Sequence, residues 1–238
     1  PAMFGDPSIG QVFSKYELRG TIVVSSIESN QAFTHNKPRA VTSYSPASTF
    51  KIFNSLIALE ENLANNKDEL FVWDETPRSI ESWNQNHTLK SAFVASCVWC
   101  FQSLAEKIGP ERYRKHLGDA GFGSLNDSFN VTEFWLDGSL KISAAGQVDF
   151  LKRLIRQSLS YSATSYEELE DVMLREATDS YQLRAKTGWT GSIGWFVGYV
   201  ETSDDTWVFA LNADVKDINL MLILPNITKE ILKAKGII

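Results

Sequence analysis

The positions of the probable strands constrain this chain most, because they fall at both ends of the sequence with helical patterns between them. Residues 20–27 are rich in β-branched side chains and predict a strand, followed by a short strand at 31–34. The last third predicts three consecutive antiparallel strands at 181–186, 193–201 and 206–213. This order favours an α/β (α+β) fold, with one central antiparallel sheet flanked by helices and an inserted helical lobe.

The middle of the chain carries apolar residues at helical spacing. A helix is predicted to begin at Ser48 and to bury Phe53 and Ile57. We expect residues 1–238 to form a single domain, in which residues 1–5 are interpreted as a cloning remnant. Further helices are predicted at 89–108, 144–159, 166–177 and 220–235, with another short helix beginning at Pro110.

Charge and hydropathy exclude several classes of partner. The formal net charge is -6 and the lysines and arginines are scattered, so nothing favours a nucleic acid or an anionic membrane surface. No apolar stretch approaches the roughly 20 residues that a membrane-spanning helix needs. The most apolar short run, 220–224, ends at Pro225. No signal peptide is recognised, so we interpret the chain as a mature form.

Cys97 and Cys100 form a C-x-x-C pair, which raises the possibility of a redox or metal site. A zinc site needs about four ligands, and the three histidines, His35, His87 and His116, are far apart in sequence. Both cysteines also lie within an apolar run. We therefore expect small buried thiols that fill the core, and no metal.

Ser48 and Lys51 form the only S-x-x-K in the chain. On a helix, this spacing places both side chains on one face. A serine hydroxyl becomes a good nucleophile when a neighbouring base takes its proton, and a lysine can be that base where burial keeps it neutral. Phe50, Ile52 and Phe53 can supply such an environment. Alone, the motif favours a simpler interpretation, in which Ser48 caps a helix and Lys51 is a solvated surface residue.

A second motif, Lys186-Thr187-Gly188, lies at the end of a predicted strand. Lysine and threonine at a strand end can hold a substrate carboxylate, and a glycine allows the substrate backbone to come close. S-x-x-K followed by K-T-G is a combination found in β-lactamases and penicillin-binding proteins. Together the two motifs favour a catalytic interpretation.

Five motifs, in the same order, make the chain resemble the class D (OXA-type) serine β-lactamases from about Phe13 to Ile238. They are Tyr44-Ser45-Pro46-Ala47-Ser48-Thr49-Phe50-Lys51-Ile52, Ser96-Cys97-Val98, Phe134-Trp135-Leu136-Asp137-Gly138, Lys186-Thr187-Gly188 and Gly194-Trp195-Phe196-Val197-Gly198-Tyr199-Val200. The resemblance implies a β-lactamase/transpeptidase-like fold and hydrolysis of a small β-lactam substrate. It also implies an exported protein, periplasmic or secreted, that is a monomer or a homodimer.

The resemblance also implies a role for each site residue. Ser48 would be the acylated nucleophile, and Lys51 would react with carbon dioxide to give a carbamate that acts as general base. Ser96 would relay a proton to the leaving nitrogen. The other implied roles are shielding of the lysine by Val98, a hydrogen bond to it from Trp135, an oxyanion hole from the backbone N–H groups of Ser48 and Trp189, and substrate binding by Lys186, Thr187, Gly188 and Trp189.

The chain departs from the family pattern at three places. Many class D enzymes carry an arginine on the C-terminal helix that pairs with the carboxylate of the drug, and here that position is Leu224. The segment 186–195 is shorter than in several relatives, so a more open rim is expected. The usual Tyr-Gly-Asn element reads Phe122-Gly123-Ser124.

Three other functions remain open at this point. A penicillin-sensing receptor domain shares these motifs but stays acylated, and commonly has a polar residue where this chain has Val98. A peptidoglycan transpeptidase or carboxypeptidase usually has an asparagine at that position. A weakly active relative of the enzymes is favoured only by Leu224.

Overall fold

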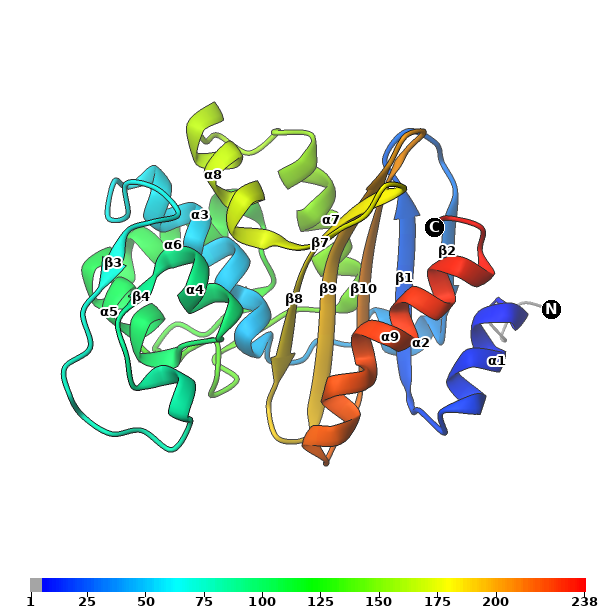
Figure 1. Cartoon of the computed structure of the whole chain (residues 1–238), viewed down its shortest axis with the longest axis horizontal. Coiled ribbons are helices and arrows are strands. Elements are labelled where there is room, and N and C mark those ends of the chain that lie inside the picture. Colours follow the sequence, from blue (N-terminus) through cyan, green and yellow to red (C-terminus); the bar gives the residue numbers. More distant parts are fainter. Residues whose placement is uncertain (1–5) are drawn as a thin grey trace.

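The computed structural model describes residues 6–238, and its centre is a six-stranded antiparallel sheet (Figure 1). Strand β1 pairs with β10 along its whole length, so the first and last strands of the chain are neighbours. This confirms the fold expected from the sequence. The strands, in the spatial order β2-β1-β10-β9-β8-β7, are β1 (Gly20–Ser26), β2 (Ala32–His35), β7 (Leu174–Ala177), β8 (Tyr181–Trp189), β9 (Ile193–Thr202) and β10 (Thr206–Asp214).

Helices cover both faces of the sheet. On one face α1 (Pro7–Lys15) and α9 (Ile218–Ala234) pack against each other and over the strands (Figure 1). On the other face α7 (Ala144–Ile155) packs against β1 and β10. Strands β9 and β10 are therefore buried on both faces, which explains why their sequences are nearly continuous apolar runs.

A helical lobe stands beside the sheet, at the left of Figure 1. Its central helix, α3 (Lys51–Glu60), is buried from Lys51 to Leu59 and packs against α5 and α8. The remaining elements of the chain are α2 (Lys37–Ala40), which packs against β1 and β2, and η1 (Ala47–Phe50), β3 (Leu70–Phe71), η2 (Glu81–Trp83), β4 (His87–Thr88), α4 (Leu89–Val94), α5 (Val98–Ile108), α6 (Pro110–Ala120), β5 (Ser124–Leu125), β6 (Leu140–Lys141) and α8 (Ala163–Met173).

The single helix expected at 89–108 is two helices, α4 and α5, separated by a sharp turn. Ser96 lies in this turn with φ 54°, a left-handed conformation that cannot continue an α-helix. Cys97 then caps α5, and its Sγ accepts a hydrogen bond from the backbone N–H of Cys100. The two cysteines are joined in a disulfide, so the expectation of free buried thiols is wrong.

The helix expected at 166–177 is also shorter than predicted. It ends at Met173, and Leu174–Ala177 form the edge strand β7. The backbone is already extended at Leu174. Pairing with β8, the next strand of the chain, satisfies the backbone of this segment, so strand pairing overrides the local helical pattern.

Candidate active site

Ser48 lies in the 3-10 turn η1, immediately before α3. Ala47 enters this turn with φ 48°, a conformation that non-glycine residues rarely adopt. The hydroxyl of Thr49 donates to the Pro46 carbonyl at 2.7 Å, and Gln147 of α7 donates to that same hydroxyl oxygen at 2.9 Å. These contacts hold the strained turn in place, and nothing in the local sequence pattern predicts the part played by Gln147.

Lys51 lies in a buried, apolar environment next to Ser48. Its side chain is fully buried, and its Nζ donates to Ser48 Oγ at 3.0 Å. The Nζ also lies 5.1 Å from the centre of the Phe101 ring. Burial, with a smaller contribution from the charge of Lys186, holds the pKa of Lys51 well below its usual value. An amine whose pKa is lowered towards the neutral form therefore lies next to the Ser48 hydroxyl, which the sequence predicts to be the nucleophile.

Trp135 is fully buried, and its indole Nε1 has no hydrogen-bond partner among residues 6–238. The ring stacks on Phe50, with centroids 6.0 Å apart, and Ser45 Oγ donates to the Trp135 carbonyl at 2.8 Å. A buried indole N–H normally finds an acceptor. This N–H is therefore available to an acceptor that the polypeptide itself does not provide.

Ser96 and Val98 lie on either side of the disulfide-bonded Cys97, and both line the cavity above Ser48. The turn between α4 and α5 directs Ser96 to this cavity. Within the described part of the chain, the Ser96 hydroxyl forms no side-chain hydrogen bond. It is therefore free to interact with a bound molecule.

The K-T-G motif lies on the last part of β8, beside η1. A Cβ on Gly188 would lie 2.9 Å from the Pro46 carbonyl oxygen and 3.0 Å from the Thr49 backbone nitrogen, so only glycine allows this approach. Lys186 is almost completely buried, and its Nζ donates to the Thr187 carbonyl at 3.2 Å. Burial, followed by the nearby charge of Arg175, lowers the pKa of Lys186 to about 7.

The backbone N–H of Trp189 points away from β9. Successive N–H groups of a strand point to opposite edges, and the neighbouring N–H of Thr190 bonds to the Ile193 carbonyl on β9. The Trp189 N–H therefore faces the other edge of β8, where Ser48 lies. The backbone N–H of Ser48 is one of the first N–H groups of η1, so it has no acceptor within that turn. The indole of Trp189 donates to the Val215 carbonyl at 2.9 Å.

One cavity of about 440 Å³ brings most of the expected site residues together. The short loop of Thr190, Gly191 and Ser192 joins β8 to β9 beside it, as the shortened sequence predicted. Lys51 and Trp135 lie buried and outside the cavity lining. The residues that line it are Ser48, Ile80, Trp83, Val94, Ser96, Val98, Leu136, Arg175, Thr187, Gly188, Trp189, Ile218, Met221, Leu222 and Pro225.

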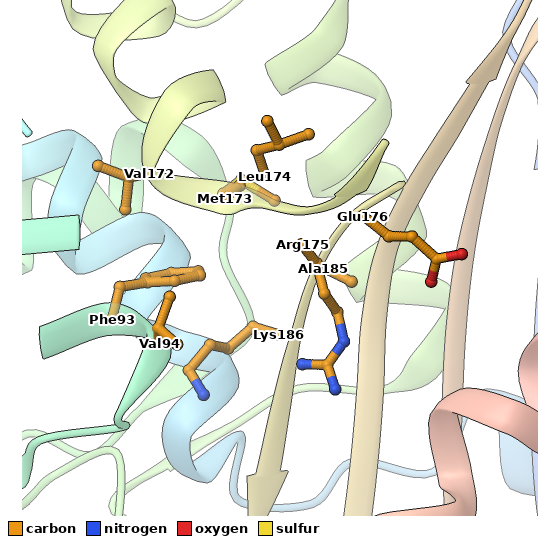
Figure 2. Close-up of a pocket in the computed structure, with 9 residues that line it drawn as sticks. All are labelled: Phe93, Val94, Val172, Met173, Leu174, Arg175, Glu176, Ala185 and Lys186. Carbon is orange, nitrogen blue, oxygen red and sulfur yellow. The ribbon is translucent and has the colours of Figure 1, made fainter. Parts of the chain in front are cut away.

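A second cavity of about 370 Å³ adjoins the first and shares Val94 and Arg175 with it (Figure 2). Lys186 lines this second cavity, with Arg175 close by on the neighbouring strand. No motif singles out Arg175, and the apolar pattern around it predicts a helix. Leu224, in contrast, is fully buried against Gly194 and does not line either cavity.

His87, Cys97 and Cys100 form a group of possible metal ligands, because their side-chain donor atoms lie within 4.8 Å of one another. The disulfide occupies both sulfurs, so neither is available as a thiolate. The ring nitrogens of His87 pair with Ser91 Oγ and the Ser82 carbonyl, each at 2.9 Å. This arrangement is a structural core and does not fit a metal centre.

The family model for the penicillin-binding protein transpeptidase domain matches residues 20–233. Among curated proteins, the chain is 40% identical to β-lactamase OXA-48 of Klebsiella pneumoniae, covering 95% of this chain and 87% of the relative. It is 39% identical to β-lactamase OXA-20 of Pseudomonas aeruginosa, covering 86% and 78%. No helix in residues 6–238 has the length and hydropathy needed to cross a bilayer.

Two solved structures show how far the likeness extends. The class D β-lactamase YbXI from Nostoc has a TM-score of 0.94 and 38% identity, covering 97% of this chain and 99% of the other. FUS-1 (OXA-85), a class D β-lactamase from Fusobacterium nucleatum subsp. polymorphum, has a TM-score of 0.94 and 33% identity, covering 98% and 99%. The likeness therefore includes both the sheet and the helical lobe.

Proposed function

Because the chain belongs to the class D serine β-lactamases, we propose that it hydrolyses β-lactam antibiotics through an acyl-enzyme on Ser48. The observation that carries this proposal is the 3.0 Å contact between Ser48 Oγ and the Nζ of a fully buried Lys51, beside a cavity open to small molecules. A sheltered amine stays neutral, as carboxylation requires, and the resulting carbamate can accept the proton that the serine must lose. The proposed chemistry uses no metal ion.

In the acylation step, Ser48 Oγ attacks the carbonyl carbon of the β-lactam ring. The backbone N–H groups of Ser48 and Trp189 donate to the oxygen on which negative charge develops. The C–N bond of the ring then breaks, and Ser96 relays a proton to the departing nitrogen. Water finally cleaves the ester on Ser48, releases the opened drug and restores the hydroxyl.

The surroundings of Lys51 fit carboxylation of its amine. Only a neutral amine captures carbon dioxide, and burial depresses the pKa of this one. Once carboxylated, Lys51 would supply a general base for both acylation and deacylation. The unpartnered indole N–H of Trp135 would donate to the added group, and Val98, at the cavity wall, would limit the access of water.

Substrate binding is assigned to the last part of β8. Thr187, Gly188 and Trp189 line the cavity along the edge of this strand, and Lys186 lies in the adjoining cavity. Gly188 allows close approach of the bound molecule and of η1. Lys186 and Thr187 are the residues proposed to attract and hold the substrate carboxylate.

We assign the protein to an oxidising compartment, the periplasm or the extracellular space. The Cys97–Cys100 disulfide supports this, because disulfides persist in such compartments and are rare in the cytosol. Residues 1–238 are proposed to work as one domain, since a single sheet contributes to both the cavity and the core. The interpretation of residues 1–5 as a cloning remnant falls outside the described residues.

A turnover assay tests the proposed function. Purified protein is mixed with a chromogenic cephalosporin, with and without added bicarbonate, and Ser48→Ala is the control. We expect many turnovers per active site, a rate raised or sustained by bicarbonate, and no reaction in the control. Stoichiometric labelling without turnover would identify a penicillin-sensing receptor. Indifference to bicarbonate, with an unmodified lysine by carbon-13 NMR, would exclude the carbamate.

A further inference from the structure

Arg175 occupies a β-bulge at the edge of the sheet, next to the candidate active site. In the pairing of β7 with β8, Leu174 is opposite Arg184 and Glu176 is opposite Leu183. Arg175 is therefore an extra residue on β7. A bulge of this kind redirects a side chain and is common next to active sites. Figure 2 shows the Arg175 side chain running along β8 towards the carboxyl end of that strand.

The guanidinium of Arg175 has no hydrogen bond or ion pair within residues 6–238, although it lies near Glu176. That carboxylate is held by Lys229 at 2.9 Å and by the Tyr181 hydroxyl at 2.6 Å. The guanidinium carbon lies 5.5 Å from the centre of the Phe196 ring. An aromatic ring can position a guanidinium and leave its N–H donors available.

Arg175 is the one charged side chain among the described residues that line the cavity containing Ser48. Lys186 adds a second positive charge in the adjoining cavity, and the two cations are close enough for Arg175 to lower the pKa of Lys186. The second cavity does include Glu176, but its carboxylate is already paired. Two neighbouring cations without a free anionic partner form a site suited to a small anion.

We propose that Arg175 binds the carboxylate of the β-lactam substrate and so replaces the arginine that the C-terminal helix lacks at Leu224. This inference rests on the proposed function. It explains how the site recognises an anionic drug although Leu224 is buried in the apolar core and contributes no charge. The guanidinium reaches the cavity from β7, on the opposite side of β8 from β9.

The test compares Arg175→Gln with the native protein on benzylpenicillin and on its methyl ester, which lacks the carboxylate. A charge-assisted hydrogen bond corresponds to about 10- to 100-fold in kcat/KM, so we expect a loss of that size for the acid. For the ester, we expect a change of less than about threefold. Arg175→Lys should lie between, because an ammonium keeps the charge but loses the bidentate geometry.

Arg153→Gln is the matched control. It removes the same charge from a cavity lined by Lys115 and Tyr161, away from Ser48, and should leave both substrates unaffected. Thermal unfolding of each variant reports whether the fold is retained. Equal losses on acid and ester would assign Arg175 a structural role, and an unchanged rate on the acid would overturn the inference directly.

Two further measurements separate this inference from the proposed function. Mass spectrometry of Ser48 acylation reports the reaction even without turnover; if neither compound acylates the protein, both proposals fail.

The second measurement is a pH profile. In Arg175→Gln, the pKa of Lys186 should rise from about 7, because the charge of Arg175 is one of the two causes that lower it. The alkaline limb of kcat/KM for the acid should then move to higher pH. An unmoved limb would contradict the assigned proximity.

Discussion

The surroundings of Lys51 and of Lys186 differ in one way that decides their chemistry. Lys51 is completely enclosed, and its amine contacts the Ser48 hydroxyl. Lys186 is also buried, but it lies at the wall of a cavity beside another cation, and its pKa is lowered to about 7. A buried amine in contact with a hydroxyl can act on it as a base, whereas a buried amine at a cavity wall can attract an anion while it is protonated.

The largest effect is expected where the sheltered amine is removed. Lys51→Ala should lower the rate of hydrolysis by about 10²- to 10⁴-fold, the range of general acid–base contributions. If acylation survives, the acyl-enzyme should accumulate, and mass spectrometry of the protein after mixing with drug would detect it. If the variant still hydrolyses the acyl-enzyme rapidly, Lys51 is not the general base.

The second largest effect is expected when the charge of Lys186 is removed. Lys186→Gln should lower kcat/KM for carboxylate-bearing drugs by about 10- to 100-fold. In the native protein Lys186 is protonated below about pH 7, so kcat/KM should fall as the pH rises through 7, by up to tenfold per unit. The variant should lack this limb. A native profile that stays flat from pH 6 to 9 would contradict the assignment.

A smaller effect is expected at the buried indole of Trp135. Trp135→Phe keeps the stacking on Phe50 and removes only the unpartnered N–H. We expect about a tenfold loss of activity, partly restored by bicarbonate, because a buried hydrogen bond to a charged group is lost. Steady-state rates measured over a bicarbonate series would check this. Full activity without added bicarbonate would mean that the N–H has no catalytic acceptor.

The smallest effect is expected for the disulfide that flanks Ser96. Its loop is very short, so the double variant Cys97→Ala/Cys100→Ala should lose only about 1–2 kcal/mol of stability. Activity should fall by a few-fold, because the turn that directs Ser96 becomes less rigid. Thermal unfolding and kcat/KM of the variant give both values. A collapse of the fold would mean that the disulfide contributes more than this short loop accounts for.

The segments that the sequence predicted well are those with strong local patterns. Strands β1, β9 and β10 have runs of apolar and β-branched residues, and the structure places them within two residues of their predicted bounds. Ser48, Ser96 and Thr187 were identified by motifs, and all three line one cavity. These strands are predicted well because the apolar residues that form each pattern are the residues that the strand buries.

The errors occurred where strand pairing or a disulfide, and not the apolar periodicity, decided the backbone conformation. The helix predicted through Ala177 gives way to β7 because β8 offers an edge to pair with, and the helix predicted through Ser96 breaks where the cysteines are joined. Gln147 and Arg175 were missed for a different reason. Gln147 bonds to Thr49 and Arg175 lines the same cavity as Ser48, so each lies beside a segment that is far from it in sequence, and neither belongs to a local motif.

Residue type and spacing are local properties of the chain, so the sequence predicts the antiparallel sheet, makes Ser48 and Lys51 the candidates for nucleophile and base, and shows leucine at position 224. The folded structure is needed to see that Lys51 is fully buried, that the Trp135 N–H has no partner among residues 6–238, and that Arg175 lines the cavity. Desolvation and charge proximity depend on which segments pack together. Those contacts exist only in the folded protein.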